Sequence, residues 1–318
     1  MDFLLILGGF ALLLLGGDIL VRGAGGIALL ARVSPAVIGL TVVAAGTSMP
    51  EMVVSIQSAL NGQPGIAVGN IVGSNIFNIA AILGIVALIS PLRVEGDAVR
   101  LQWPAMMLAT VLFFLLTRDT ILDRIEGSAF IIGMVVFISY SIWVSRMNSK
   151  PETQHSAHDL PTIPLGKTAP VRLITHIGAV IAGIALLAVG AHVLVNGAVG
   201  VARIFNVSET VIGLTIVAAG TSMPELITSM VAAFRKRDDI AVGNIIGSNI
   251  FNVLAIGGVT SAISPIPISN EITDRDNLWM LALSLLLLPI IRSGMIISRN
   301  EAAMLLALFG IYLATLFI

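Results

Sequence analysis

Long apolar segments alternate with short polar ones along all 318 residues of the chain. A helix needs roughly 20 predominantly apolar residues to cross a hydrocarbon core about 30 Å thick, and runs of that kind recur from one end to the other. The pattern predicts an all-α membrane protein with ten transmembrane helices. Their expected ranges are 3–30, 35–60, 67–90, 101–117, 128–145, 170–202, 209–234, 241–263, 277–292 and 301–317.

An internal repeat underlies this pattern. Residues 39–91 and 213–265 align without a gap at a constant offset of 174, and 32 of their 53 positions are identical. Each half then holds five helices, and an odd number requires the second half to enter the membrane from the opposite side. The sequence therefore predicts two inverted repeats, the architecture of many secondary transporters. Their boundaries are 1–145 and 170–318, joined by a polar linker at 146–169.

Basic residues indicate the orientation in the membrane. With the N-terminus outside, 13 of the 17 Lys and Arg residues fall on inside loops, as the positive-inside rule requires. The loop at 61–65 carries no charge, whereas its repeat at 235–239 reads Arg-Lys-Arg-Asp-Asp. We expect both termini outside and the linker in the cytoplasm. The membrane would be the plasma membrane, which in a prokaryote is the inner membrane.

Composition narrows the class of protein further. Hydrophobic residues make up 57% of the chain and charged residues 11%, against roughly 25% charged in soluble domains. This composition predicts that most of the protein is embedded in the lipid bilayer. A net charge of −1 without a basic stripe excludes nucleic acid as a partner. The chain contains no cysteine, which excludes disulfides and thiolate metal sites.

The repeat carries polar residues inside apolar helices, where they are costly and mark functional sites. In the motif GTSMPE, Thr47 and Glu51 are four residues apart and share one helix face. Pro50 removes a backbone donor and clashes with the carbonyl of Gly46, so we expect helices two and seven to be broken. Freed carbonyls at such breaks coordinate cations in transporters. The second copy repeats the motif at residues 220–225.

The next helix of each copy adds Ser74 and Asn78, or Ser248 and Asn252, again four residues apart. Together the motifs offer carboxylates, hydroxyls, amide oxygens and main-chain carbonyls, which as hard ligands favour Ca²⁺, Mg²⁺, Mn²⁺ or Na⁺. The two negative charges of two carboxylates are balanced by one divalent ion or by two monovalent ions, so the divalent ion and the monovalent ions can replace one another at the site. A single hydroxyl could instead join neighbouring helices, and a single buried glutamate could be protonated and structural. The duplication favours cation binding by Glu51 and its repeat, Glu225.

These motifs carry a family resemblance that covers the whole chain. GTSMPE, present twice, and the pair GNIVGSNIFN and GNIIGSNIFN resemble the two repeats of the cation/Ca²⁺ antiporter superfamily, especially prokaryotic Na⁺/Ca²⁺ exchangers. The resemblance implies that Glu51 and Glu225 bind Ca²⁺ together with the carbonyls of Thr47 and Thr221. It implies Na⁺ ligands at Ser48, Ser74, Ser222 and Ser248 and at the carbonyls of Ala44 and Ala218, with Asn78 and Asn252 at the centre.

The resemblance also implies that helices one and six slide across a rigid core. One departure concerns Asn252, because some prokaryotic exchangers and the K⁺-dependent branch carry Asp at this position. The amide makes the site less negative by one charge, which argues against K⁺ co-transport.

The combined interpretation is a secondary antiporter that exchanges Na⁺ for Ca²⁺ by alternating access and moves net charge. No resident cofactor is expected, Ca²⁺ and Na⁺ are the transported ions, and a single chain suffices for transport. Ca²⁺/H⁺ exchange on the same scaffold, with both glutamates carrying protons, is the alternative. A passive cation channel is disfavoured because channels usually build filters from symmetric subunits or rings of carbonyls. An enzyme is disfavoured because the sequence shows no Ser–His or paired-Asp constellation.

Overall fold

The structure, a computed structural model, describes residues 2–31, 33–148, 169–204 and 218–316. Over these ranges the chain folds into helices joined by short turns, with four strands of two residues each. Elements labelled η are helical turns of other pitch: η4 is a 3₁₀ turn and the rest are π-helical. The first half contains α1 (Asp2–Ala31), α2 (Pro35–Ile38), η1 (Gly39–Val43), α3 (Ala44–Thr47), α4 (Met49–Leu60), α5 (Pro64–Ile76), η2 (Phe77–Ile82), α6 (Leu83–Ile89), β1 (Leu92–Arg93), η3 (Ala98–Gln102), α7 (Trp103–Leu116), η4 (Thr117–Asp119), β2 (Ile121–Leu122) and α8 (Arg124–Asn148). The second half contains α10 (Ala169–Ile204), α12 (Ala218–Thr221), α13 (Met223–Phe234), α14 (Asp238–Phe251), η6 (Asn252–Gly257), α15 (Gly258–Ile263), β3 (Ile266–Pro267), η7 (Ile272–Asp276), α16 (Asn277–Arg292), β4 (Ile296–Ile297) and α17 (Arg299–Thr315).

Six helical segments among the described residues are long and apolar enough to cross a membrane. They are Asp2–Ala31, Pro64–Ile89, Ala98–Asp119, Arg124–Met147, Val171–Ala202 and Asp238–Ile263. A further candidate is the pair Pro35–Thr47 and Met49–Leu60, bent by 46° at its break. Helices suit this setting because they satisfy their own backbone hydrogen bonds in lipid. The chain is therefore an integral membrane protein.

The ends of these six spans lie within four residues of the ranges predicted from the hydrophobic pattern. Three predicted elements extend beyond the described residues. Residues 209–217 of the expected seventh helix, residues 149–168 of the expected linker and residue 317 of the expected tenth helix lie outside them.

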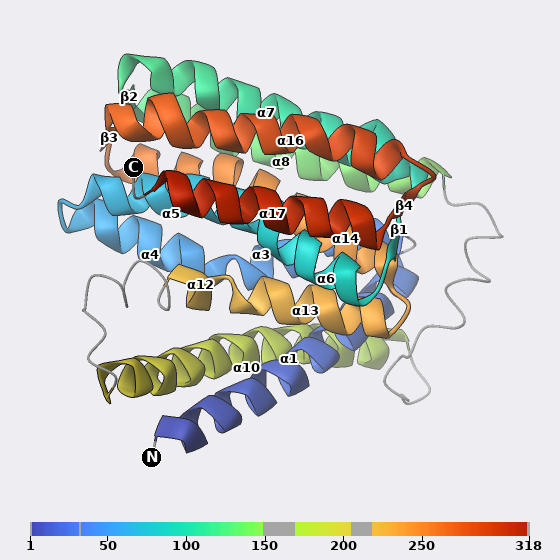
Figure 1. Ribbon diagram of the computed structural model, residues 1–318. Coiled ribbons are helices and arrows are strands. Elements are labelled where there is room, and N and C mark those ends of the chain that lie inside the picture. Colours follow the sequence, from blue (N-terminus) through green and yellow to red (C-terminus); the bar gives the residue numbers. More distant parts are fainter. Residues whose placement is uncertain (1, 32, 149–168, 205–217, 317–318) are drawn as a thin grey trace.

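The two longest helices, α1 and α10, form an antiparallel pair along one side of the molecule (Figure 1). Glycines allow their backbones to touch, as small residues do in membrane helix pairs. A Cβ atom on Gly16 would lie 2.9 Å from the backbone nitrogen of Leu187. A Cβ atom on Gly183 would lie 2.8 Å from the backbone nitrogen of Leu20. The pair is thus closely packed along its length, while α1 also contacts α13.

The rest of the bundle is interlocked between the two halves of the sequence. Strand β1 pairs with β4, and β2 pairs with β3, so each short sheet joins one half to the other. Likewise α8 packs on α15, α17 packs on α6, and α7 packs on α16. The two sheets lie at opposite ends of the bundle, and α1 begins and α17 ends at the end that holds β2 and β3 (Figure 1).

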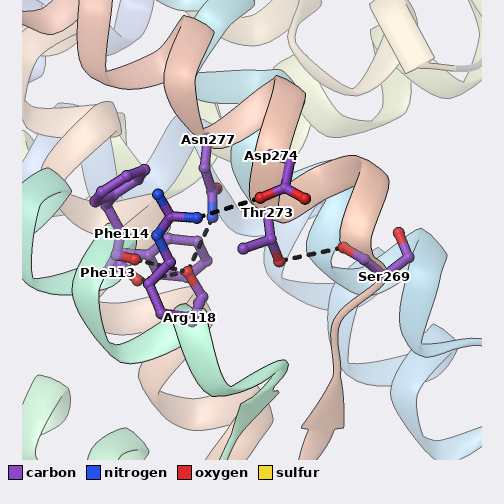
Figure 2. A network of polar contacts seen from close by, with 8 residues as sticks. Phe113, Phe114, Arg118, Ser269, Thr273, Asp274 and Asn277 are labelled. Carbon is purple, nitrogen blue, oxygen red and sulfur yellow. Dashed lines mark hydrogen bonds and ion pairs between the residues drawn. The ribbon is translucent and has the colours of Figure 1, made fainter.

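Polar contacts reinforce one of these junctions. Figure 2 shows Arg118 and Asp274, whose side chains form an ion pair of 3.2 Å between η4, which directly follows α7, and η7. Nearby, the Asn277 amide donates to the Thr117 hydroxyl over 2.9 Å. The Arg118 guanidinium also lies 4.5 Å from the centre of the Phe114 ring. These contacts fix the start of α16 against the end of α7.

Burial separates the inner helices from the outer ones. The most apolar window of the span Asp238–Ile263 is fully buried within the protein, and that of Pro64–Ile89 is 78% buried. The corresponding windows of the other four spans are only 22–33% buried, so they present apolar side chains to the lipid. The second polar motif of each repeat therefore lies on the innermost spans of the bundle.

Candidate cation-binding site

Two helix breaks place the first polar motif at the centre of the bundle. Helix α3 ends at Thr47 and α4 begins at Met49, while Ser48 between them has φ −84° and ψ 8°. Ser222 separates α12 from α13 in the same way. Pro50 lies in the first turn of α4, where a missing backbone donor does little harm. The predicted break is thus observed, at Ser48, between Gly46 and Pro50.

Each break directs a glutamate toward the opposite half of the chain. Glu51 lies in the first turn of α4 and Glu225 in the first turn of α13, where the helix dipole favours a negative charge. The Ser48 hydroxyl donates to Oε1 of Glu225 over 2.8 Å. The Ser222 hydroxyl donates to Oε1 of Glu51 over 2.9 Å. All four side chains are at most 1% exposed, so the two glutamates and the two serines form one buried crossed cluster.

Five buried oxygens of the predicted ligands lack hydrogen-bond partners among the described residues. They are Oε2 of Glu51, Oε2 of Glu225, Oδ1 of Asn78, Oδ1 of Asn252 and Oγ of Ser248. A buried polar atom without a partner costs about 1–3 kcal/mol, and a charged one costs more. A bound cation would give such oxygens a partner, and their chemistry matches the hard ligands that Ca²⁺ and Na⁺ take.

The asparagines in this set occupy unusual helical positions. Asn78 lies in the π-helical turn η2, and Asn252 begins the π-helical turn η6. Such turns are rare and are frequent at functional sites. Ser74 and Ser248 lie one turn earlier, on α5 and α14, and both are buried.

The remaining predicted ligands lie on the segments before each break. Thr47 is 1% exposed, and its hydroxyl donates over 3.3 Å both to the carbonyl of Ala44 and to Oδ1 of Asn244. The Ala44 carbonyl also accepts the backbone N–H of Ser48. Ala218 begins α12 and Thr221 ends it. Ion binding by the carbonyls of these four residues (Ala44, Thr47, Ala218 and Thr221) stays a prediction.

Sequence reasoning overlooked the asparagine that begins the second motif of each repeat. The Asn70 amide donates to the Ser55 hydroxyl over 2.8 Å and to the carbonyl of Glu51 over 3.0 Å. Asn244 makes the matching contacts in the second half. The signal was available, because both copies read Gly-Asn at this point, but spacing alone does not show which helix the amide faces.

Acidic groups elsewhere do not form a competing site in the described part of the chain. No group of three or more His, Asp or Glu side chains with metal-binding geometry is found there. Asp18 pairs with Arg22, four residues later on the same helix, over 2.9 Å, and also with Arg235 beyond the end of α13. Any ion in the central cluster would therefore rely on two carboxylates and neutral oxygens.

Comparisons with known proteins show the family of the chain. The family model described as sodium/calcium exchanger protein matches residues 1–143 and 175–318. The putative antiporter CaxA of Alkalimonas amylolytica is 40% identical over 319 residues, covering 98% of this chain and 97% of the relative. The sodium/calcium exchanger MaX1 of Methanosarcina acetivorans is 32% identical over 347 residues, covering 99% and 98%.

Solved structures point the same way. The sodium-calcium exchanger NCX_Mj, soaked with 10 mM Na⁺ and no Ca²⁺, superposes with a TM-score of 0.84 at 31% identity, covering 99% of this chain and 98% of that one. A further relative by sequence is the inner membrane protein YrbG of Escherichia coli, which is 35% identical over 285 residues, covering 89% of this chain and 86% of the relative. The chain therefore belongs to the sodium/calcium exchanger family of membrane antiporters, and it is a transporter rather than an enzyme.

Proposed function

We propose that the protein exchanges Na⁺ for Ca²⁺ across the membrane by alternating access, with net movement of charge. The crossed cluster carries this proposal: two buried glutamates, each held by a serine of the other half, each keep one carboxylate oxygen without a partner. One Ca²⁺ balances both carboxylates. Neutral oxygens beside them offer places for more than two Na⁺, and an exchange of more than two Na⁺ for one Ca²⁺ is electrogenic.

The proposed ligands follow from this charge balance. Ca²⁺ would bind the carboxylates of Glu51 and Glu225 together with the carbonyls of Thr47 and Thr221. Na⁺ would use the four serines of the motifs and two further carbonyls, with the two central asparagines between them: Ser48, Ser74, Ser222, Ser248, Ala44, Ala218, Asn78 and Asn252. Among the described side chains of these ligands, all but the half-buried Thr221 are buried, which favours ion binding over exposure to bulk water.

The proposed architecture is a pair of inverted five-helix repeats over residues 1–145 and 170–318, joined by a cytoplasmic linker at 146–169. Two observations support it. The family model matches twice, at 1–143 and at 175–318, an offset of 174 residues, and the strand pairs β1–β4 and β2–β3 exchange between the halves. Both termini would lie outside, helices α1 and α10 would slide across the inner helices, and one chain would suffice for transport.

Orientation has a direct test because the natural chain contains no cysteine. Single cysteines at the exposed Gln63 and Lys236 would lie on opposite sides of the membrane. In whole cells, a membrane-impermeant maleimide should label the cysteine in place of Gln63 and spare the one in place of Lys236. The reverse labelling would invert the proposed topology, and labelling of both in intact cells would refute it.

Ca²⁺/H⁺ exchange is the second candidate, because two buried carboxylates with free oxygens suit proton carriage as well. Uptake of ⁴⁵Ca²⁺ into Na⁺-loaded proteoliposomes separates the two. Na⁺/Ca²⁺ exchange requires uptake in Na⁺-free external buffer that disappears when Na⁺ is equal on both sides. Uptake that ignores Na⁺ and follows a pH gradient would reject it in favour of proton coupling. Single-channel currents without countertransport would indicate a channel instead.

A further inference from the structure

Each half contains an asparagine that joins the helix of the glutamate to the helix of the central asparagine. Nδ2 of Asn70, on α5, donates to Oγ of Ser55 over 2.8 Å and to the main-chain oxygen of Glu51 over 3.0 Å. Nδ2 of Asn244, on α14, donates to Oγ of Ser229 over 2.9 Å and to the main-chain oxygen of Glu225 over 3.5 Å. The same two contacts therefore occur twice.

The contacts of the second half are the more deeply buried. Asn244 and Ser229 are fully buried, whereas Asn70 is partly exposed. Oδ1 of Asn244 also accepts a hydrogen bond from the Thr47 hydroxyl over 3.3 Å. Asn244 thus contacts both the turn that carries Glu225 and the segment of the first half that ends at its break. Its amide donor and its amide acceptor are both in use.

The neighbouring asparagines behave differently. The Asn75 amide donates to the carbonyl of Ile71 over 2.7 Å, and the Asn249 amide donates to the carbonyl of Ile245 over 2.9 Å. Both contacts are to the asparagine's own helix, four residues earlier. An asparagine in this segment thus has a local partner available, and the longer-range contacts of Asn70 and Asn244 do not follow from its presence alone.

We propose that Asn70 and Asn244 are positioning residues, which fix the separation between each ion-binding glutamate and the oxygens of the facing helix. The inference rests on the proposed function. Asn70 lies eight residues before Asn78 on one continuous helix, and Asn244 lies eight residues before Asn252. The amide of Asn70 or Asn244 therefore connects the backbone of the glutamate to the same helix that carries the central asparagine.

This separation matters more for Ca²⁺ than for Na⁺. Ca²⁺ contacts its oxygens over a narrow range of about 2.3–2.6 Å, and here one ion would have to reach both carboxylates at once. Each Na⁺ needs only one carboxylate. Loosening either glutamate-bearing turn should therefore raise the KM for Ca²⁺ more than the half-saturating concentration of Na⁺.

The test compares Asn244→Ala with Asn70→Ala and with the control Asn75→Ala, which removes only a contact within one helix. Asn244→Ala removes the bond from Thr47 and also the two bonds that hold the turn of Glu225. The loss of those two, at ordinary strength, corresponds to roughly a tenfold rise in KM for Ca²⁺. Asn70→Ala should show a smaller rise, because its site is partly hydrated. The half-saturating Na⁺ concentration should change by less than about threefold in either variant, and the control should keep both constants.

The outcome that overturns the proposal is a fall in kcat with an unchanged KM for Ca²⁺, or an equal shift for both ions, since a merely structural contact would produce either. If Asn244→Ala does not fold, Ser229→Ala removes one partner and keeps the amide; it should raise the Ca²⁺ KM about threefold.

Failure of the proposed function is recognised separately. The wild-type protein is first assayed for Na⁺-driven uptake, and ⁴⁵Ca²⁺ binding to each purified variant is measured in parallel. A wild-type protein that binds Ca²⁺ without Na⁺-driven uptake would refute the coupling alone, and the affinities of the variants would still decide the positioning role. A wild-type protein that binds no Ca²⁺ would overturn both.

Discussion

Replacement of Glu51 by glutamine tests the crossed cluster most directly. The amide has nearly the same shape, and its oxygen still accepts the Ser222 hydroxyl that now contacts Oε1 of Glu51. What the substitution removes is one of the two negative charges within the cluster. The fold should therefore persist while the affinity for Ca²⁺ collapses.

The magnitude follows from Coulomb's law. For a carboxylate about 2.4 Å from Ca²⁺ and an effective dielectric of about 20, the direct attraction is roughly 14 kcal/mol. Desolvation of the buried carboxylate offsets most of this. If a quarter survives, about 3.5 kcal/mol remains, which corresponds to a several-hundred-fold loss of Ca²⁺ affinity.

The assay is thermal unfolding of the purified protein with and without Ca²⁺, alongside ⁴⁵Ca²⁺ uptake. A ligand at about 100 times its Kd stabilises the folded state by roughly 2.7 kcal/mol, so the wild-type melting temperature should rise with Ca²⁺. Glu51→Gln should unfold at or above the ion-free wild-type temperature, because it lacks a buried charge, and should gain nothing from Ca²⁺. Glu271→Gln, at an exposed carboxylate, is the control and should respond as the wild type does. Ca²⁺ stabilisation and uptake at wild-type levels in Glu51→Gln would refute the cation site.

Three further predictions follow from contacts elsewhere in the structure. In a double-mutant cycle, Ser48→Ala and Glu225→Ala should couple by about 1–3 kcal/mol in the unfolding free energy of the ion-free protein, because the Ser48 hydroxyl donates to the Glu225 carboxylate. Strictly additive effects would contradict this hydrogen bond. Gly16→Val should lower the yield of folded protein sharply, because a Cβ there would lie 2.9 Å from the backbone of the facing helix. The control Gly8→Val should be tolerated, because a Cβ there meets nothing within 4 Å. Equal yields of the two variants would argue against the close helix pair. Asp18→Asn removes ion pairs to two arginines. Because these groups are partly hydrated, the unfolding free energy should fall by at most about 1 kcal/mol. A much larger fall would contradict the assignment of these pairs as weak, partly hydrated contacts.

The helices were largely predictable from the sequence. Their positions follow from the length of apolar runs, because a helix is the structure that satisfies its own backbone in lipid. The break near Pro50 was predictable too, since a proline inside a helix removes a donor and clashes with the preceding turn. The structure places the break at Ser48, so Pro50 lies in the first turn of α4.

The partner of each serine was not predictable from local rules. Ser48 and Glu51 match the capping-box pattern, in which a serine and a glutamate three residues later close a helix start. Ser298 and Glu301 form that box. Within the described chain Ser48 makes no such cap, because its backbone N–H already bonds to the carbonyl of Ala44 and leaves nothing for Glu51 to accept.

The sequence by itself determined that the chain crosses the membrane many times, that it contains one polar motif twice, and which residue types that motif offers to an ion. Those features depend on hydrophobic length and on spacing along a helix, which are local. The tertiary structure alone decided that Ser48 reaches Glu225 and Ser222 reaches Glu51, and that Asn244 joins both halves. These contacts join residues 171 to 197 positions apart, and they arise from packing between the halves, which no local pattern encodes.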